Sequence, residues 1–215
     1  MEASATTPKP SGYYDLERAD VVAELPRPIG RALDVGCGSG GVGLSLKAAG
    51  AESVTGVEVN PEAAAVARTR LDAVHEMPVE DAIAAGVLQG PFDTICTYDV
   101  LEHLVDPEPV LKALLAVAAP GGRLHISIPN ARHFTLLRDL LFRGTFGYTE
   151  FGHRDVTHLR WYTRRDLIAL VSRCGWQVRA CDGSFSGRDR YADKASFGRA
   201  REFLTVQWHL LATAP

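Results

Sequence analysis

The amino-acid sequence predicts an α/β fold in which helices cover both faces of a doubly wound, mostly parallel sheet. Five short apolar segments that suit buried strands alternate with helix-like segments between residues 31 and 128. Strands that alternate with helices in this way pair in parallel through crossover connections. A glycine-rich turn joins the first strand to the helix that follows it, which is typical of nucleotide-type sites. Two further strand-like segments, 176–182 and 203–212, raise the expected number of strands to seven.

Length and composition indicate one globular domain. The chain has 215 residues, of which 46% are hydrophobic and 23% charged, so a sizeable core can form. Its four cysteines include no Cys-x-x-Cys pair, and we expect reduced thiols in a cytoplasmic protein. No apolar run is long enough to span a bilayer. We expect a disordered lead-in at 1–12 and a single domain at 13–215.

The first strand leads into the stretch around which the chain is organised, residues 31–41, which reads Arg-Ala-Leu-Asp-Val-Gly-Cys-Gly-Ser-Gly-Gly. Its glycines allow a tight turn and let backbone N–H groups approach a ligand. Their spacing also fits the Gly-x-Gly-x-x-Gly pattern of dinucleotide-binding loops. Asp34, however, lies two residues before the first glycine. A carboxylate at this position repels a pyrophosphate and suits a cation.

The other elements follow from apolar periodicity and from residues that begin a helix. Asn60 and Asp106 each precede a proline and a glutamate, which is typical of a helix start. Thr163 and Asp166 form a capping box at the start of the last expected helix. The expected helices are 16–25, 41–49, 61–70, 107–118, 133–142 and 163–174. The first five expected strands are 31–35, 53–59, 71–76, 92–98 and 123–128.

Glu58 is the second acidic residue that the pattern singles out. It lies at the end of the second expected strand, about 20 residues after the glycine turn, where a carboxylate accepts hydrogen bonds from both hydroxyls of a ribose. The carboxyl ends of the strands in an open α/β sheet form the ligand crevice. We therefore expect Glu58 and Asp34 to lie in one site.

Several motifs resemble those of class I S-adenosylmethionine-dependent methyltransferases. The Asp-x-Gly-x-Gly-x-Gly run at 34–40 is similar to the first motif of this family, whose glycine loop cradles the methionine part of the cofactor. The Leu-Glu-His pattern at 101–103 and the Pro-Gly-Gly turn at 120–122 resemble ubiquinone-biosynthesis-type O-methyltransferases and their small-molecule relatives. The Asp-x-Thr-His-Leu-Arg run at 155–160 is similar to one in methyltransferases of polysaccharide and natural-product pathways. The resemblance covers roughly residues 13–176.

The resemblance implies a Rossmann-like methyltransferase fold whose last strand is antiparallel. It also implies that the segment 130–162, inserted after the fifth strand, covers the substrate. The cofactor implied is S-adenosyl-L-methionine. The residues expected to bind it are Tyr13, Tyr14, Arg18, Asp34, Gly36, Cys37, Gly38, Gly40, Glu58, Val59, Asp81 and Tyr98.

Two of these cofactor assignments have alternatives. The family usually places an Asp for the adenine amino group after the third strand, but Pro78 occupies that register here. Asp81 is then the expected substitute, and the alternative is that the backbone with Met77 and Val79 holds the adenine. The paired tyrosines at 13 and 14 either close over the cofactor, with Arg18 near its carboxylate, or pack the first helix onto the domain.

Catalysis is expected to depend on histidine, because a neutral imidazole is the natural base near neutral pH. The candidate bases are His158 and His103, with Asp155 orienting His158; the alternative is that each histidine has a structural role. The residues expected to contact the acceptor are His153, Tyr148, Arg160 and Trp161. The spacing His153-x-Asp155-x-x-His158 also suits a divalent ion but is not diagnostic, and no metal is expected.

The sequence therefore predicts methyl transfer to a small molecule, with a hydroxyl oxygen of a natural product, sugar or quinone-type metabolite as acceptor. The alternatives are N- or C-methylation, a nicotinamide-dependent oxidoreductase, and a catalytically silent cofactor-binding module. Residues 131–201 contain 14 Arg or Lys against 7 Asp or Glu, which favours an anionic acceptor unless these arginines only face solvent. No nucleic-acid or membrane partner is expected, and the protein is expected to be a monomer or a homodimer.

Overall fold

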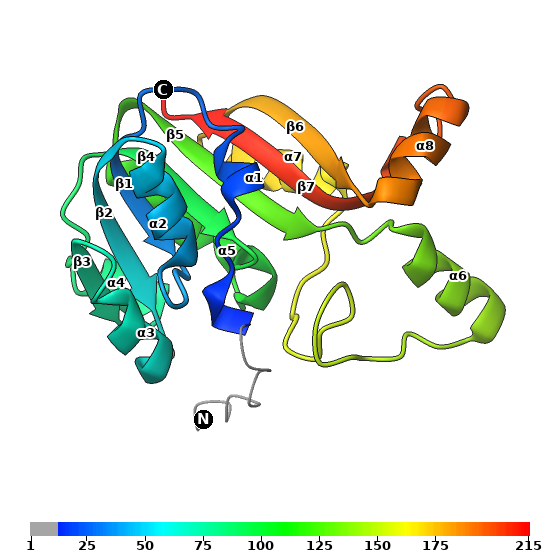
Figure 1. Cartoon of the computed structure of the whole chain (residues 1–215), viewed down its shortest axis with the longest axis horizontal. Coiled ribbons are helices and arrows are strands. Elements are labelled where there is room, and N and C mark those ends of the chain that lie inside the picture. The colour runs from blue at the N-terminus through cyan, green and yellow to red at the C-terminus, as the bar shows by residue number, and fades with distance from the viewer. Residues whose placement is uncertain (1–12) are drawn as a thin grey trace.

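The computed structural model describes residues 13–215, so the expected lead-in at 1–12 lies outside the described residues. Its strands are β1 (Gly30–Val35), β2 (Ala51–Glu58), β3 (Ala73–Glu76), β4 (Phe92–Tyr98), β5 (Ala118–Pro129), β6 (Gln177–Phe185) and β7 (Thr205–Thr213). They form one sheet in the order β3-β2-β1-β4-β5-β7-β6 (Figure 1). Strands β1 to β5 pair in parallel, and β7 is antiparallel to both of its neighbours. The predicted seven-stranded, mostly parallel sheet with an antiparallel last strand is confirmed.

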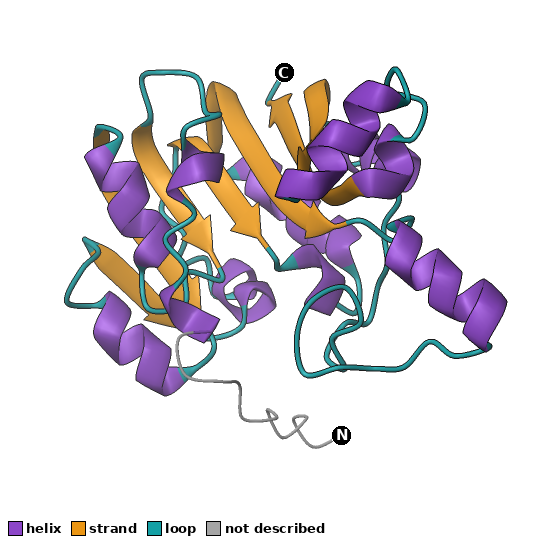
Figure 2. Ribbon diagram, turned by 45° about the vertical axis from the view of Figure 1, so that its right-hand side comes forward, coloured by secondary structure: helices purple, strands orange, loops and turns teal. Residues whose placement is uncertain are grey.

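Helices flank the sheet on both faces (Figure 2). The α-helices are α1 (Ala19–Val22), α2 (Gly41–Ala48), α3 (Pro61–Ala67), α4 (Val79–Ala84), α5 (Pro107–Ala116), α6 (Phe134–Arg143), α7 (Arg164–Arg173), α8 (Gly187–Ala195) and α9 (Arg201–Leu204). Two short 3-10 helices are η1 (Tyr13–Asp15) and η2 (Leu101–His103). Helices α1 and α2, with the end of α3, enclose one apolar cluster, and α4, α5 and α7 enclose the other. The sheet therefore has a buried face on each side, as a doubly wound fold requires.

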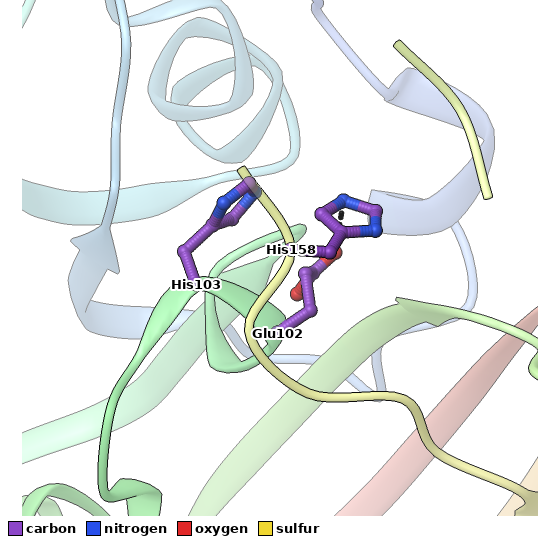
Figure 3. A group of neighbouring side chains, drawn as sticks. All are labelled: Glu102, His103 and His158. Atoms are coloured by element: carbon purple, nitrogen blue, oxygen red, sulfur yellow. Dashed lines mark ion pairs between the residues drawn. The ribbon is translucent and has the colours of Figure 1, made fainter. Parts of the chain in front are cut away.

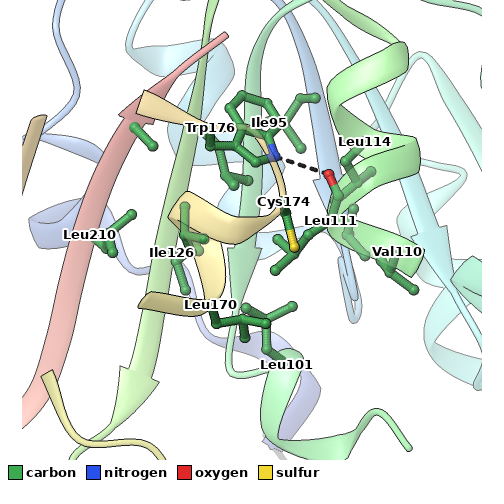
Figure 4. Close-up of a cluster of buried hydrophobic side chains, with 14 of the residues drawn as sticks. Ile95, Leu101, Val110, Leu111, Leu114, Ile126, Leu170, Cys174, Trp176 and Leu210 are labelled. Atoms are coloured by element: carbon green, nitrogen blue, oxygen red, sulfur yellow. Dashed lines mark hydrogen bonds between the residues drawn. The ribbon is translucent and has the colours of Figure 1, made fainter. Parts of the chain in front are cut away.

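The larger cluster joins β1, β4, β5, β6 and β7 to the helices that cover them. Near its centre the indole Nε1 of Trp176 donates a hydrogen bond to the carbonyl oxygen of Leu111 over 2.9 Å (Figure 4). Trp176 is buried just before β6, and Leu111 is a buried residue of α5. This hydrogen bond satisfies the polar N–H group of the indole, whose surroundings are otherwise apolar. All four cysteines are buried free thiols, which agrees with the expected reduced state.

The structure corrects several expected element boundaries. Helix α4 replaces the loop expected after the third strand, since Glu80 and Asp81 lie in its first turn, where acidic residues are favourable. The Pro-Gly-Gly run at 120–122 lies inside β5 rather than between helix and strand, because α5 already ends at Ala116 and Ala118 pairs with Phe92. The helix expected at 16–25 is only the four residues of α1. Helices α8 and α9 were not predicted.

The segment after β5 leaves the body of the protein and returns to it at nearly the same place. Its two ends meet where Asn130 and Tyr162 form an isolated bridge, with Ala131 N–H donating to the carbonyl of Tyr162 over 2.9 Å. The buried amide of Asn130 also donates to the carbonyls of Glu202 and Thr205. Between these ends, α6 and the long loop after it project from the sheet and its helices (Figures 1 and 2).

The Trp176 contact gives a test of this core. Trp176→Phe is expected to lower the free energy of unfolding by about 1–3 kcal/mol, from the lost hydrogen bond and the smaller ring together. Trp161→Phe is the matched control, because Trp161 is 40% exposed and such a change is expected to stay within about 0.5 kcal/mol. Urea denaturation of the two variants measures both values. Equal effects would show that the indole bond is not important for the core.

Candidate active site

The glycine turn lies at the carboxyl end of β1, beside the end of β2. The backbone N–H groups of Gly36 and Cys37 both donate to the carbonyl of Val57, over 2.8 and 3.0 Å. Gly38 has a positive φ of 52°, and a Cβ built on it would lie 2.6 Å from the carbonyl oxygen of Tyr14. That same oxygen accepts a hydrogen bond from Ser39 N–H over 2.9 Å. The chain before α1 therefore lies directly on the turn, and only glycine leaves room for this approach.

Glu58 is positioned by the same turn. Its Oε2 accepts a 2.8 Å hydrogen bond from Gly38 N–H, and its Oε1 accepts one of the same length from Asn60 N–H. The side chain is 6% exposed. Each carboxylate oxygen has a second lone pair that these two bonds do not use. The predicted ribose acceptor therefore lies at the end of β2, next to the glycine turn, and is held in one orientation.

Asp34 is the more deeply buried of the two acidic residues beside the glycine turn. It is 1% exposed, and its Oδ2 has no hydrogen-bond partner among residues 13–215. Burial, and next the neighbouring Glu58 carboxylate, raise the pKa of Asp34 to about 8. A buried carboxyl group with one unpartnered oxygen beside a glycine cradle fits a cationic ligand such as the ammonium or sulfonium of S-adenosylmethionine. The residues present therefore fit the cofactor that the sequence implied.

Arg18 ties the N-terminal segment to the sheet. Its guanidinium donates to Asp99 Oδ2 over 2.8 Å, to Ser127 Oγ over 3.0 Å and to Gln207 Oε1 over 2.7 Å. Gln207 Nε2 in turn donates to Asp99 Oδ1. Asp99 directly follows β4 and has a positive φ of 54°, which is uncommon outside glycine. The contacts of Arg18 agree with the anchoring alternative for this segment, and its contact with the cofactor carboxylate remains a prediction.

Other expected cofactor residues lie in varied settings. The Tyr98 hydroxyl is bonded to His125 Nδ1 over 2.8 Å inside the protein, so it is engaged with a core residue. Val59 is exposed directly after β2, and Asp81 is exposed in the first turn of α4. The structure describes the backbone of Tyr13 in η1. The roles of these residues in binding remain predictions.

The two candidate bases lie together with a third residue, Glu102 (Figure 3). One ligand-type atom from each of Glu102, His103 and His158 lies within 4.8 Å of those from the other two. The rings of His103 and His158 make an edge-to-face contact with centroids 4.8 Å apart. His158 Nε2 is 4.0 Å from Glu102 Oε1. Residues that are 55 positions apart in the sequence therefore form one cluster after the end of β4.

Backbone hydrogen bonds hold this cluster together. The carbonyl of Glu102 accepts from Leu159 N–H over 2.8 Å and from Arg160 N–H over 3.0 Å. Asp155 is buried, and its Oδ1 accepts from the N–H and the hydroxyl of Thr157 over 2.9 and 2.7 Å. Asp155 thus shapes the turn that carries His158. Its predicted role in orienting the His158 ring remains a prediction.

The residues expected to contact the acceptor are distributed along the projecting segment. Trp161 and Tyr148 each contact the ring of Phe146, with centroids 5.5 and 5.1 Å apart. Arg160 donates to the carbonyl of Val105. His153 Nε2 is bonded to the carbonyl of Val206, and its ring stacks on His133. Within the described chain, the potential metal ligands that gather are those of the Glu102 cluster, so the alternative set of His153, Asp155 and His158 is not assembled.

Glu102 is the residue of this site that the sequence prediction missed. The signal was present, because Glu102 directly precedes His103 in the Leu-Glu-His pattern. Gln207 was also missed, because only the pairing of β5 with β7 brings it to this edge of the sheet. No local pattern in the sequence identifies such a partner.

Comparison with known proteins now decides the family. The chain matches the family described as Methyltransferase domain over residues 12–180, which is most of its length. The chain belongs to this methyltransferase family. It is a class I S-adenosylmethionine-dependent methyltransferase, and S-adenosylmethionine is its cofactor. The nicotinamide-dependent oxidoreductase that the glycine spacing also allowed is therefore set aside.

Two curated relatives of the methyltransferase are named Ubiquinone biosynthesis O-methyltransferase. The one from Xylella fastidiosa is 32% identical over 209 residues, which cover 80% of this chain and 82% of the relative. The one from Xanthomonas axonopodis pv. citri is 31% identical over 164 residues, which cover 66% of this chain and 65% of the relative. The second match spans slightly less than two thirds of that relative's length.

Solved structures share the fold. A methyltransferase from Thermotoga maritima, described as a possible histamine N-methyltransferase, has a TM-score of 0.65 at 18% identity, with 93% of this chain and 88% of that chain covered. The [4+2]-cyclase SpnF has a TM-score of 0.62 at 18% identity, covering 92% and 80%. At these identities the likeness shows the fold alone. None of the helices within residues 13–215 is long and apolar enough to cross a membrane.

Proton release tests the position of Asp34. With a pKa of about 8, this carboxyl group is mostly protonated at pH 7 in the free methyltransferase. A bound cation favours the ionised form, so binding of S-adenosylmethionine is expected to release up to about one proton at pH 7 and almost none at pH 9.5. Calorimetry in buffers of different ionisation enthalpy measures this release. Asp34→Asn is expected to abolish it and the exposed control Asp20→Asn to retain it; equal release in both would contradict the assignment.

A second prediction concerns the ribose. Glu58→Ala is expected to weaken cofactor affinity more than tenfold, because the ribose hydroxyls lose a charged acceptor worth about 1.5–3 kcal/mol. Titration calorimetry measures the affinity. The control is Glu52→Ala, since Glu52 is exposed near the opposite end of β2. Unchanged affinity in a folded Glu58→Ala variant would exclude Glu58 as the ribose ligand.

Proposed function

We propose that this methyltransferase transfers the methyl group to a hydroxyl oxygen of a small-molecule acceptor of the natural-product, sugar or quinone type. The observation that carries the proposal is the cluster of buried Glu102, half-buried His103 and buried His158 beyond the end of β4. The carboxyl ends of the parallel strands form the ligand crevice in this class of sheet. Methylation of a hydroxyl requires removal of its proton, and the cluster offers groups that promote this. The names of the two curated relatives support the same acceptor atom.

Each part of the site has a separate task in this proposal. The glycine turn, Asp34 and Glu58 hold the cofactor, which supplies an activated methyl group when bound. The Glu102 cluster promotes ionisation of the acceptor hydroxyl. Orientation of the two reactants contributes much of the rate, because methyl transfer is an in-line displacement.

The projecting segment 130–162 is proposed to cover the acceptor. Phe146, Tyr148 and Trp161 form a chain of ring contacts, and such rings suit an acceptor with an apolar or aromatic body. Tyr148 and Trp161 are both partly exposed and available for contact. We propose Arg160 as a contact for an anionic group of the acceptor, on the basis of its charge and its place next to the cluster.

The acceptor atom is tested with the purified enzyme, methyl-labelled cofactor and a library of phenols, sugars, amines and activated carbon acids. Labelled methyl ethers are the expected products, identified by mass spectrometry and by their stability to mild acid. Label found only on nitrogen or carbon would contradict the proposal in favour of the N- or C-methylation alternatives. The absence of any transfer would favour the silent cofactor-binding module.

His158 gives the third prediction for the site. His158→Gln is expected to lower turnover by about 100-fold or more, the usual scale for loss of acid–base assistance, while cofactor affinity stays near wild type. If His158 only anchors the loop, the variant shows a lower melting temperature and weaker acceptor binding, with an unchanged pH–rate profile. His75→Gln on β3 is the control. Wild-type turnover at saturating acceptor in a folded His158→Gln enzyme would exclude a chemical role.

A further inference from the structure

The Glu102 cluster has the composition of a metal-binding site. We propose that Glu102, His103 and His158 bind one divalent metal ion of the zinc type, which holds the acceptor oxygen. This inference rests on the proposed O-methyl transfer and specifies how the same site activates the acceptor hydroxyl. It replaces the metal-free site expected from the sequence.

Glu102 provides the first argument, because its carboxyl group is buried without a partner. The residue is 1% exposed, and neither Oε1 nor Oε2 has a hydrogen-bond partner among the described residues. A buried carboxylate is unfavourable unless a cation or hydrogen bonds compensate it. Its ion pair with His158 spans 4.0 Å, which is longer than a hydrogen bond. The group is therefore available to a ligand.

The charges around Glu102 also favour a cation. Burial first, then the carboxylates of Asp99 and Asp155, raise the pKa of Glu102 well above its usual value, and Arg18 opposes this. Three carboxyl groups thus share this region with one guanidinium, which is already bonded to Asp99. A divalent ion between Glu102 and the two imidazoles would favour the ionised form of Glu102, which its surroundings otherwise disfavour.

His103 has the arrangement that metal-binding histidines usually show. Its Nδ1 lies 3.2 Å from the carbonyl oxygen of Thr157. A carbonyl only accepts hydrogen bonds, so Nδ1 carries the proton and the lone pair of the neutral ring is on Nε2. A histidine that binds a metal through one nitrogen commonly donates the other N–H to such a carbonyl, which fixes the ring.

The geometry needs only a small contraction to accept an ion. Nitrogen and oxygen ligands about 2.0–2.2 Å from zinc lie roughly 3–4 Å from one another. The three donor atoms here are already within 4.8 Å, and the His158–Glu102 pair is at 4.0 Å. The hydrogen bonds from Leu159 and Arg160 to the Glu102 carbonyl hold the two segments in place. Small side-chain rotations therefore complete the site.

The donor set indicates both the type of ion and its role. Two imidazoles and one carboxylate are the ligands of catalytic zinc sites that keep a position open, and imidazole suits zinc or cobalt better than magnesium. An ion in this position lowers the pKa of a bound hydroxyl group. The acceptor O–H bond breaks and its proton passes to water; the new O–C bond forms as the C–S bond breaks, and that electron pair returns to sulfur. His158 then acts as a ligand rather than as the base.

Metal binding is tested on the full chain after dialysis against a chelator. Titration with Zn²⁺, and with Co²⁺ followed by its visible absorption, is expected to show one equivalent bound and weaker binding of Mg²⁺. Glu102→Gln, His103→Gln and His158→Gln are each expected to weaken binding by more than about tenfold. His75→Gln serves as the matched control with unchanged affinity. Absence of binding, or equal affinity in the three cluster variants and the control, would overturn the proposal.

Activity separates this inference from the proposed function. Chelation is expected to abolish methyl transfer to a hydroxyl acceptor, and Zn²⁺ or Co²⁺ to restore it. Full turnover after chelation would overturn the metal site and leave O-methylation by a His158 base in place. One equivalent of bound metal together with labelled products only on nitrogen or carbon would overturn the proposed hydroxyl acceptor but not the metal site.

Discussion

The burial of carboxyl groups at one edge of the sheet is the constraint on which the rest of this structure depends. Asp34, Glu58 and Glu102 lie near the carboxyl ends of different strands, and each is at most 6% exposed. Negative charge in such surroundings is unfavourable unless donors or cations compensate it. Glu58 receives two backbone N–H groups, whereas Asp34 Oδ2 and both oxygens of Glu102 have no such partner within residues 13–215. The edge is therefore organised to receive positive charge.

Two segments distant in sequence complete this edge by contacts with the backbone. The N-terminal segment is held by Ser39 at the glycine turn and by Arg18 on Asp99, while the later segment is held by the carbonyl of Glu102. Both segments thereby contact residues that lie within a few positions of the carboxyl ends of β1 and β4. In the proposed function, the first segment lies beside the cofactor and the second brings His158 to the acceptor.

The sequence predicted most of what depends on local pattern and less of what depends on tertiary contacts. Asp34, Glu58 and the glycine turn were identified because a strand, a turn and a helix specify their place. His103 and His158 were both named, but their contact with one another was not. The two residues are 55 positions apart, and only the tertiary fold brings them together. Helix α4 was missed because Glu80 and Asp81 are typical of both loops and first turns. The roles of Arg18 and Gln207 depend on strand pairing that no local pattern reveals.

The bridge between Asn130 and Tyr162 has a consequence for the evolution of specificity. Because the chain leaves and rejoins the sheet at adjacent points, the excursion between them is closed at its base by a short set of backbone bonds. Lengthening such an excursion adds little closure entropy, about 0.6 kcal/mol for each doubling of its length. Insertions and substitutions there leave the strand register undisturbed. Selection can thus remodel the segment that we propose to cover the acceptor, while the glycine turn and the residues around it stay constant.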